Sequence, residues 1–438
     1  MNVKRKTTKR KSKARQKKKF SFVTIIQKIY LSLVFFFIND MWSYASACAF
    51  GFLFSFIPVV MLVLIILIRF FHATPEVIDS LFGDSGLMAS FLNLDSVANT
   101  ISGIHSVTNF EIIIGITIIW MARRFFSSVV GSINRIFHTQ VPFRPLLSQV
   151  VIIAAEAGMV IVSSLIIILN VAFKTLIKLD IFQSLSSMFP VLLGTVTERM
   201  VIYLPYIIIF VVVFICYKAS SRSNPPTWTC LWCAAACTGG FFVIQKLMGI
   251  FLNVNRYNMI YGVLSNIIVL LLEVFFFFVI FLSFAEFVFV SQYFDTLLLS
   301  EIYRLPDRDK TGLISTFRRL LFIRPDHLLN SDENVMHFRK GEEIYSNGED
   351  GKFMYYIVSG TVMLLKKNNI AFVDSGSFFG EEAILMDGIR KEDAVAHTDL
   401  KLIRINESKF YSILQKNPKV ASKAMAKISR YFAWSVNA

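Results

Sequence analysis

The chain is poor in charged residues and in metal-ligating residues. Only 17% of its 438 residues are Asp, Glu, Lys or Arg, and 55% are apolar, against roughly 25% charged residues in an ordinary soluble domain. This balance excludes a single soluble domain. Five cysteines, an odd number in an apolar setting, do not form a disulfide framework. Cys230, Cys233 and Cys237 share a helix face but lack a fourth ligand nearby, so we favour helix packing over metal binding and expect no metal.

Acidic residues are missing from the first 19 positions, which hold 11 of the 45 Lys and Arg residues. The rest of the chain is only mildly basic. Because the positive charge is confined to a tail, it does not indicate a nucleic-acid-binding face. We interpret residues 1–19 as a tail that binds anionic lipid headgroups, and contact with RNA during membrane insertion is the alternative.

Long apolar runs dominate the chain up to about residue 295. A helix needs about 20 apolar residues to cross about 30 Å of hydrocarbon, and six runs approach or exceed that length. They predict an all-α membrane domain of six transmembrane helices over residues 42–295. The candidate spans are Ala49–Phe71, Gly103–Met121, Val150–Val171, Met200–Tyr217, Trp228–Phe251 and Val263–Val290.

The connections between these runs differ in charge. Lys and Arg number 17 on one side, tail included, and 4 on the other, which places both termini in the cytoplasm. Residues 20–41 carry polar side chains on one helical stripe, so they predict an interfacial amphipathic helix and not a seventh span. Whether residues 103–121 fully span the membrane is left open, because their unbroken apolar core is short.

Three carboxylates lie within the predicted spans, where a charge is expensive to bury. They are Glu156, Glu273 and Glu286. One interpretation is a path for a substrate or a proton. The other is a protonated or hydrogen-bonded contact between helices.

Short motifs recur in order along this half of the chain. They are Ser43–Ala45 with Ser55–Pro58, Trp120–Arg124, Asn134, Tyr217 with Pro225 and Pro226, Tyr261 with Gly262, and Ala285–Phe287. Over about residues 20–295 these motifs resemble the YihY/BrkB family, which implies a six-helix domain of the bacterial inner membrane. Members of that family have carried ribonuclease and virulence-factor labels. RNA cleavage needs an acid/base pair or a metal cluster that the six histidines do not provide, so we expect no enzyme and no catalytic residues.

After about residue 295 the composition becomes that of an ordinary soluble protein. Residues 296–329 are charged and partly helical, and they predict linker helices. Residues 330–438 contain short alternating runs broken by glycines, followed by a helical pattern near the end. This pattern predicts a small β-roll or jelly roll with flanking helices.

Motifs at fixed turns of residues 330–438 are Lys340–Glu342, Gly348–Gly351, Tyr355–Gly360, Phe379–Glu381 and Arg390. They resemble the cyclic nucleotide-binding domain. The resemblance implies that Glu381 accepts the ribose 2′-hydroxyl, that backbone N–H groups after Gly380 meet the phosphate, and that Arg390 neutralises its charge. The implied ligand is cAMP or cGMP, with no cofactor required. The candidate binding residues are Phe379, Gly380, Glu381, Glu382, Ala383, Arg390 and Lys391.

The sequence departs from that family just after Arg390, where Lys391 is followed by Glu392 and Asp393. Two carboxylates near a phosphate would oppose it by about 1 kcal/mol each in wet surroundings. In an empty roll, Arg390 would pair with Glu381 or Glu382 instead. Nucleotide binding, and a roll that has lost or changed its ligand, both stay open.

These features predict a multi-pass inner-membrane protein with a cytoplasmic β-roll. The first hypothesis for its function is transport or permeation regulated by that roll. The alternative is a membrane scaffold without transport, or an envelope-associated virulence factor, whose roll recruits a partner. The transported species, the choice between cAMP and cGMP, and assembly into a homo-oligomer are left open.

Overall fold

The structure is a computed structural model, and it describes nine segments of the chain: residues 22–69, 124–137, 190–220, 224–251, 263–305, 313–322, 334–366, 369–386 and 388–436. The described residues fall into two compact units. One lies between Leu31 and Gln292, and the other combines the residues up to Tyr30 with those from Tyr293 onward. The predicted spans Gly103–Met121 and Val150–Val171, and with them Glu156, lie outside the described residues.

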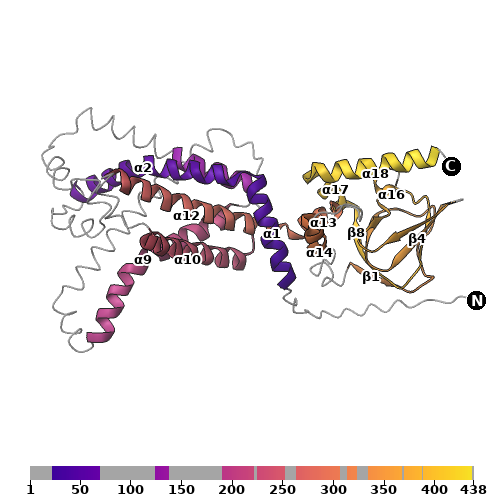
Figure 1. Ribbon diagram of the computed structural model, residues 1–438, viewed down its shortest axis with the longest axis horizontal. Coiled ribbons are helices and arrows are strands. Elements are labelled where there is room, and N and C mark those ends of the chain that lie inside the picture. Colours follow the sequence, from indigo (N-terminus) through magenta and orange to yellow (C-terminus); the bar gives the residue numbers. More distant parts are fainter. Residues whose placement is uncertain are drawn as a thin grey trace, which may run out of the picture. The chain divides into compact units, whose positions relative to one another are not determined.

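The first unit is built from long apolar helices. α12 packs between α2 and α10, and α10 also packs against α9 (Figure 1). Within the described residues, α10 and α12 are each long and apolar enough to cross a membrane, and α1 with α2 passes together as a third, bent candidate. The predicted helical character of this part is therefore confirmed, with two or three candidate spans among the described residues, and six spans stay a prediction. The helices are α1 (Phe22–Ile38), α2 (Met41–Arg69), α9 (Pro190–Ala219), α10 (Thr227–Phe251) and α12 (Val263–Gln292).

The chain bends by 68° between α1 and α2. Asp40 lies at this break in the left-handed region, with φ of 55°. The side-chain amide of Asn39 donates a hydrogen bond to Glu286 Oε1 of α12 at 2.8 Å, and both residues are buried. Ser32 donates to the Ser283 carbonyl at 3.3 Å. Side-chain hydrogen bonds therefore tie the bend to α12.

Aromatic side chains fill the interface around α12. The ring of Phe281 stacks on Tyr217 of α9 with centroids 5.3 Å apart, and the Tyr217 hydroxyl donates to the Phe281 carbonyl at 2.8 Å. The helical residues 124–137 also contact α12, because the ring of Phe137 lies edge-on to Phe289 at 5.8 Å. Rings this large bury much apolar surface per residue, which explains how a chain rich in Phe packs these helices.

The second unit contains two four-stranded antiparallel sheets, with strand orders β1-β8-β3-β6 and β2-β7-β4-β5 (Figure 1). Ile357, Val362 and Leu402 are fully buried in the core between them. This arrangement confirms the predicted β-roll. Its strands are β1 (Val335–Phe338), β2 (Glu343–Tyr345), β3 (Phe353–Ser359), β4 (Thr361–Lys366), β5 (Asn369–Asp374), β6 (Phe378–Phe379), β7 (Asp393–Ala396) and β8 (Leu400–Asn406).

A tight turn at Gly360 joins β3 to β4. Gly360 has φ of 94°, and a Cβ there would lie 2.5 Å from the Asp399 carbonyl oxygen. Any other residue would be strained and would clash, so glycine at this position allows the chain to cross from one sheet to the other.

Among its described residues, the second unit contains five complete helices. Tyr303 of α13 is buried, with its ring centroid 5.1 Å from Phe378 of β6 and 5.9 Å from Phe410 of α17. The first half of α1 also belongs here, since Gln27 donates to the Leu321 carbonyl of α14 at 2.7 Å. The five helices are α13 (Phe294–Tyr303), α14 (Leu313–Phe322), α16 (Glu381–Leu385), α17 (Glu407–Lys416) and α18 (Pro418–Val436).

Candidate ligand pocket of the β-roll

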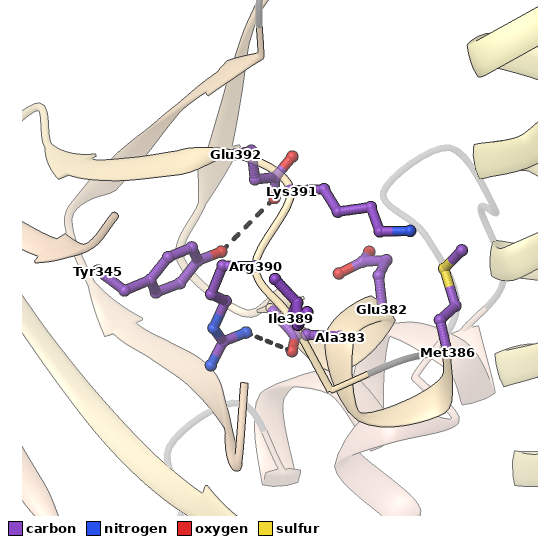
Figure 2. A pocket seen from close by; sticks show the side chains of 9 residues that line it. Tyr345, Glu382, Ala383, Met386, Ile389, Arg390, Lys391 and Glu392 are labelled. Atoms are coloured by element: carbon purple, nitrogen blue, oxygen red, sulfur yellow. Dashed lines mark hydrogen bonds between the residues drawn. The ribbon is translucent and has the colours of Figure 1, made fainter. Parts of the chain in front are cut away.

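A pocket opens on the roll between the end of β2, the short helix α16 and the loop that leads into β7 (Figure 2). Its empty space is ≈ 280 Å³ when the open mouth is counted, but the space that a water molecule can occupy is only ≈ 10 Å³. This is room for about one water and far below the usual range for small-molecule sites, so a nucleotide needs the pocket to open further. The residues that line it are Tyr345, Gly380, Glu382, Ala383, Met386, Ile389, Arg390, Lys391 and Glu392.

Gly380 caps α16 in the left-handed conformation, with φ of 77°. A Cβ at this position would lie 2.5 Å from Nη1 of Arg390. Glycine is therefore needed twice, once for the backbone angle and once for the close approach of the guanidinium.

Arg390 is only 3% exposed and is held by the backbone. It donates from Nη1 to the Gly380 carbonyl at 2.6 Å and from Nη2 to the Phe353 carbonyl. Its guanidinium carbon lies 4.1 Å from the ring centroid of Tyr345, a cation–π contact (Figure 2). Arg390 makes no ion pair with any described residue, and its buried Nε has no hydrogen-bond partner among them. The pairing with Glu381 or Glu382 that the sequence left open is absent from the described residues.

A stack of three rings supports this arginine. The rings of Tyr355 and Phe379 lie 5.3 Å apart, and each lies 6.1 Å from Tyr345. Phe379, which the sequence placed among the binding residues, thus contributes to the wall behind Arg390 and does not itself line the pocket.

Glu381 takes a different direction from the one implied by the resemblance. It is 1% exposed, does not line the pocket, and pairs through Oε1 with Lys427 of α18. Its Oε2 has no hydrogen-bond partner among the described residues. Sequence reasoning missed Lys427, because nothing in an amphipathic helix 46 residues downstream shows which of its lysines reaches the roll.

Only one of the two carboxylates that follow Arg390 lines the pocket. Asp393 instead accepts the Asn347 backbone N–H at 2.6 Å, in a turn. Glu392 accepts the Tyr345 hydroxyl at 3.5 Å, and burial raises the pKa of its carboxyl (Figure 2). Glu392 is therefore the one of these two carboxylates that is placed to oppose a bound phosphate.

Glu382 faces the pocket in place of Glu381. Burial, and next the neighbouring Glu381 carboxylate, raise the pKa of Glu382. The pocket therefore combines the Arg390 guanidinium and the Lys391 ammonium with the carboxyl groups of Glu382 and Glu392, whose pKa values burial raises. Such a site suits a ligand with one negative charge and several hydroxyl or amine groups.

Of the three carboxylates predicted within the spans, the structure describes Glu273 and Glu286, and these two do not meet in one site. Glu273 is half-buried on α12, while Glu286 on the same helix is fully buried against Asn39. Cys230, Cys233 and Cys237 are buried on α10, and none of them forms a disulfide bond with a described residue. Among the described residues, no group of three potential ligands from His, Cys, Asp and Glu is placed to hold a metal ion.

The sequence matches two protein families. The family described as Virulence factor BrkB matches residues 37–299, and the cyclic nucleotide-binding domain matches residues 335–417. The expected order of the two domains is therefore confirmed, and the apolar helices and the first family together indicate a membrane protein.

Among curated proteins, the chain is similar to a cAMP-dependent protein kinase regulatory subunit of Mucor circinelloides f. lusitanicus. The two are 33% identical over 84 residues, which is 18% of this chain and 20% of that protein. It is also similar to the cyclic AMP receptor protein of Thermus thermophilus, at 27% identity over 99 residues, 21% of this chain and 46% of the relative. The chain thus spans less than half the length of these relatives, and the likeness is confined to the roll.

Among solved structures, the crystal structure of the Thermus thermophilus catabolite activator protein is 23% identical and covers 26% of this chain and 56% of its own. Its TM-score is 0.22.

Proposed function

The chain belongs to the virulence factor BrkB family and carries a cyclic nucleotide-binding domain, and from this premise we propose that a cyclic nucleotide, bound in the pocket of the β-roll, regulates its membrane domain. We further propose that the membrane domain transports or conducts a solute across a bacterial inner membrane. The excess of Lys and Arg on one side supports a cytoplasmic location for the roll, the compartment in which cyclic nucleotides are made.

One observation carries the proposal: the environment of Arg390. A buried arginine with no ion pair among the described residues is rare, because removing a charge from water is expensive unless something compensates. Here two carbonyls and the Tyr345 ring hold the guanidinium beside the pocket. A cyclic phosphate would supply the missing negative charge, through hydrogen bonds that the charge strengthens.

Chain continuity supports a link to the membrane. α13 begins at Phe294, directly after α12 ends at Gln292, with Tyr293 between them. At its other end, Tyr303 packs on Phe378, the neighbour of Phe379 in the wall behind Arg390. Because α13 directly follows α12 in the sequence, a change in the roll that moves α13 would act on α12 through the chain itself. Regulation also requires that the nucleotide bind one state of the protein more tightly than the other.

The test is titration of the full chain, in lipid nanodiscs, with cAMP and cGMP by calorimetry. We expect micromolar binding that Arg390→Ala weakens at least about 30-fold, because removing one partner of a buried charge pair commonly costs 2 kcal/mol or more. The matched control is Arg339→Ala, which removes an exposed arginine of the same roll and should leave binding unchanged.

Hydrogen exchange of β3 and β8 in Arg390→Ala checks that the variant roll is still folded. Equal affinity of folded Arg390→Ala and wild type would contradict the proposed site. Binding that leaves solute flux through the same protein in liposomes unaltered would contradict the regulatory role.

A second function, a scaffold whose roll recruits a protein partner without a ligand, is favoured by one observation. The chain's own groups already occupy the main binding groups of the pocket, since Arg390 bonds two carbonyls and Glu381 pairs with Lys427. No binding of either nucleotide at millimolar concentration would favour this function over the first.

A further inference from the structure

Lys427, on the C-terminal helix α18, joins three parts of the second unit. Its Nζ pairs with Glu381 Oε1, lies 3.4 Å from the Phe378 carbonyl oxygen, and lies 5.6 Å from the ring centroid of Tyr303. A single ammonium group therefore contacts α16, β6 and α13. These are the binding helix, the strand beside it and the helix that follows the last membrane span.

The burial of the two partners is unequal. The Glu381 side chain is 1% exposed and the Lys427 side chain is 29% exposed. A carboxylate this deeply buried needs a partner, and within the described residues its only partner is Lys427. The lysine, in contrast, has a route to water.

The direction of the Glu381 side chain matters because its neighbour faces the other way. Glu382 lines the pocket and Glu381 does not. For Glu381 to accept a hydroxyl of a ligand in the pocket, its carboxylate must turn away from α18 and lose its contact with Lys427.

We propose that Lys427 is a latch. It holds the Glu381 carboxylate against α18 and out of the pocket, and a cyclic nucleotide competes with Lys427 for that carboxylate. Nucleotide binding then loosens α18 from the roll. The opposite arrangement, in which α18 closes over the bound nucleotide, would pack α18 more tightly on the roll. This inference rests on the proposed function and gives it a direction.

The release of α18 reaches α13 by a second contact. Lys423, one turn before Lys427, donates to the Leu305 carbonyl just after α13 at 2.8 Å, and its Nζ lies 5.9 Å from the Tyr303 ring. Through these contacts, Lys423 and Lys427 hold α18 against both α13 and α16. By linkage, the factor by which the latch weakens nucleotide binding equals the factor by which nucleotide weakens the latch.

The first measurement is the affinity of full-length Lys427→Met in nanodiscs for cAMP and cGMP. We expect nucleotide to bind about tenfold more tightly than to wild type, within the range typical of coupled sites. Lys427→Gln, which keeps one hydrogen-bond donor, should give a smaller gain and serves if the methionine variant does not fold. Lys419→Met, at an exposed position of the same helix, is the matched control and should bind like wild type.

The second measurement needs no nucleotide: hydrogen exchange of residues 418–436 in each protein. Lys427→Met and Lys423→Met should both lose protection in α18, but only Lys427→Met frees Glu381 directly and should show the full gain in affinity. In wild type, saturating nucleotide should also lower protection of α18.

The outcomes distinguish a failure of the latch from a failure of the proposed function. Binding to Lys427→Met that is equal to wild type or weaker, or nucleotide that raises protection of α18, overturns the latch and leaves the proposed function standing. No binding to any variant overturns the proposed function and the competition with it, even if protection of α18 still depends on Lys427.

Discussion

Two buried carboxylates, one in each unit, have nearly the same burial but opposite kinds of partner. Glu286 in the membrane helices is 0% exposed and Glu381 in the roll is 1% exposed. Each uses Oε1 in a hydrogen bond, and each leaves Oε2 without a partner among the described residues. The partner of Glu286 is the neutral amide of Asn39, itself buried, whereas the partner of Glu381 is the partly exposed ammonium of Lys427.

This difference teaches what each contact is suited to do. Asn39 lies at the break between α1 and α2, and its bond to Glu286 links this break to α12. Inside a membrane no water is present to replace the hydrogen bond of a buried polar group. Lys427 lies on a terminal helix at the surface of its unit, and water can replace Glu381 as its partner. The bond of Asn39 to Glu286 therefore holds the bend against α12, whereas water or another group can replace Glu381 as the partner of Lys427.

The largest expected effect is at the contact between Asn39 and Glu286. Glu286→Ala leaves the buried Asn39 amide without its acceptor, and we expect the free energy of unfolding to fall by about 3 kcal/mol. Thermal unfolding of the full chain in detergent measures it. Glu286→Gln keeps a carbonyl acceptor and the volume, and should lose less than about 1 kcal/mol. Equal losses in the two variants would show that the charge of Glu286, and not its hydrogen bond with Asn39, stabilises the contact between the bend and α12.

An intermediate effect concerns Glu382, which lies beside Glu381 but forms no ion pair with any residue that the structure describes. Burial raises the pKa of Glu382 above the ordinary 4.5. Between pH 4.5 and this raised pKa, the folded roll therefore binds more protons than the unfolded chain. Its contribution is therefore lost as the pH rises from about 4.5 through the raised pKa. Glu382→Gln should stabilise the roll by about 1 kcal/mol at pH 8, allowing for solvent at the pocket mouth, and not at pH 4.

Pulse proteolysis of the full chain at both pH values, following the C-terminal fragment, measures this change. Glu349→Gln, at an exposed position of the same roll, is the control. A gain that is equal at pH 4 and pH 8 would contradict the titration of Glu382.

The smallest effect is expected at an ion pair that shares its chemistry with Lys427 and Glu381 but not their burial. Lys352 Nζ lies 2.8 Å from Asp350 Oδ2, with side chains 67% and 75% exposed. Water competes for both groups, so Lys352→Ala should leave the unfolding transition of the roll unchanged. A clear loss of stability there would mean that burial does not set the strength of these pairs.

Much of the roll was predictable because its signals are local. Glycines that must adopt positive φ, such as Gly360 and Gly380, determine turns wherever they occur. The resemblance to the cyclic nucleotide-binding domain likewise directed attention to Gly380, Glu381 and Arg390 as one region of the roll. What could not be predicted is the direction of the side chains: Glu381 faces Lys427, Glu382 faces the pocket, and Asp393 belongs to a turn.

The membrane domain shows the same division. Apolar runs indicated helices at α10 and α12, but the bend at Asp40 and the bond from Asn39 to Glu286 needed the packed helices. Sequence reasoning placed Glu286 within a span without its partner, because Asn39 is 247 positions away along the chain.

Composition alone predicted that the first part of this chain enters a membrane and that the last part resembles an ordinary soluble domain. The transfer free energy of a segment depends on which residues it contains, whatever their neighbours. Tertiary structure alone decided which buried charge meets which partner. A hydrogen bond depends on distance and angle between groups that only folding brings together, and the contact of Lys427 with Glu381 is the clearest example here.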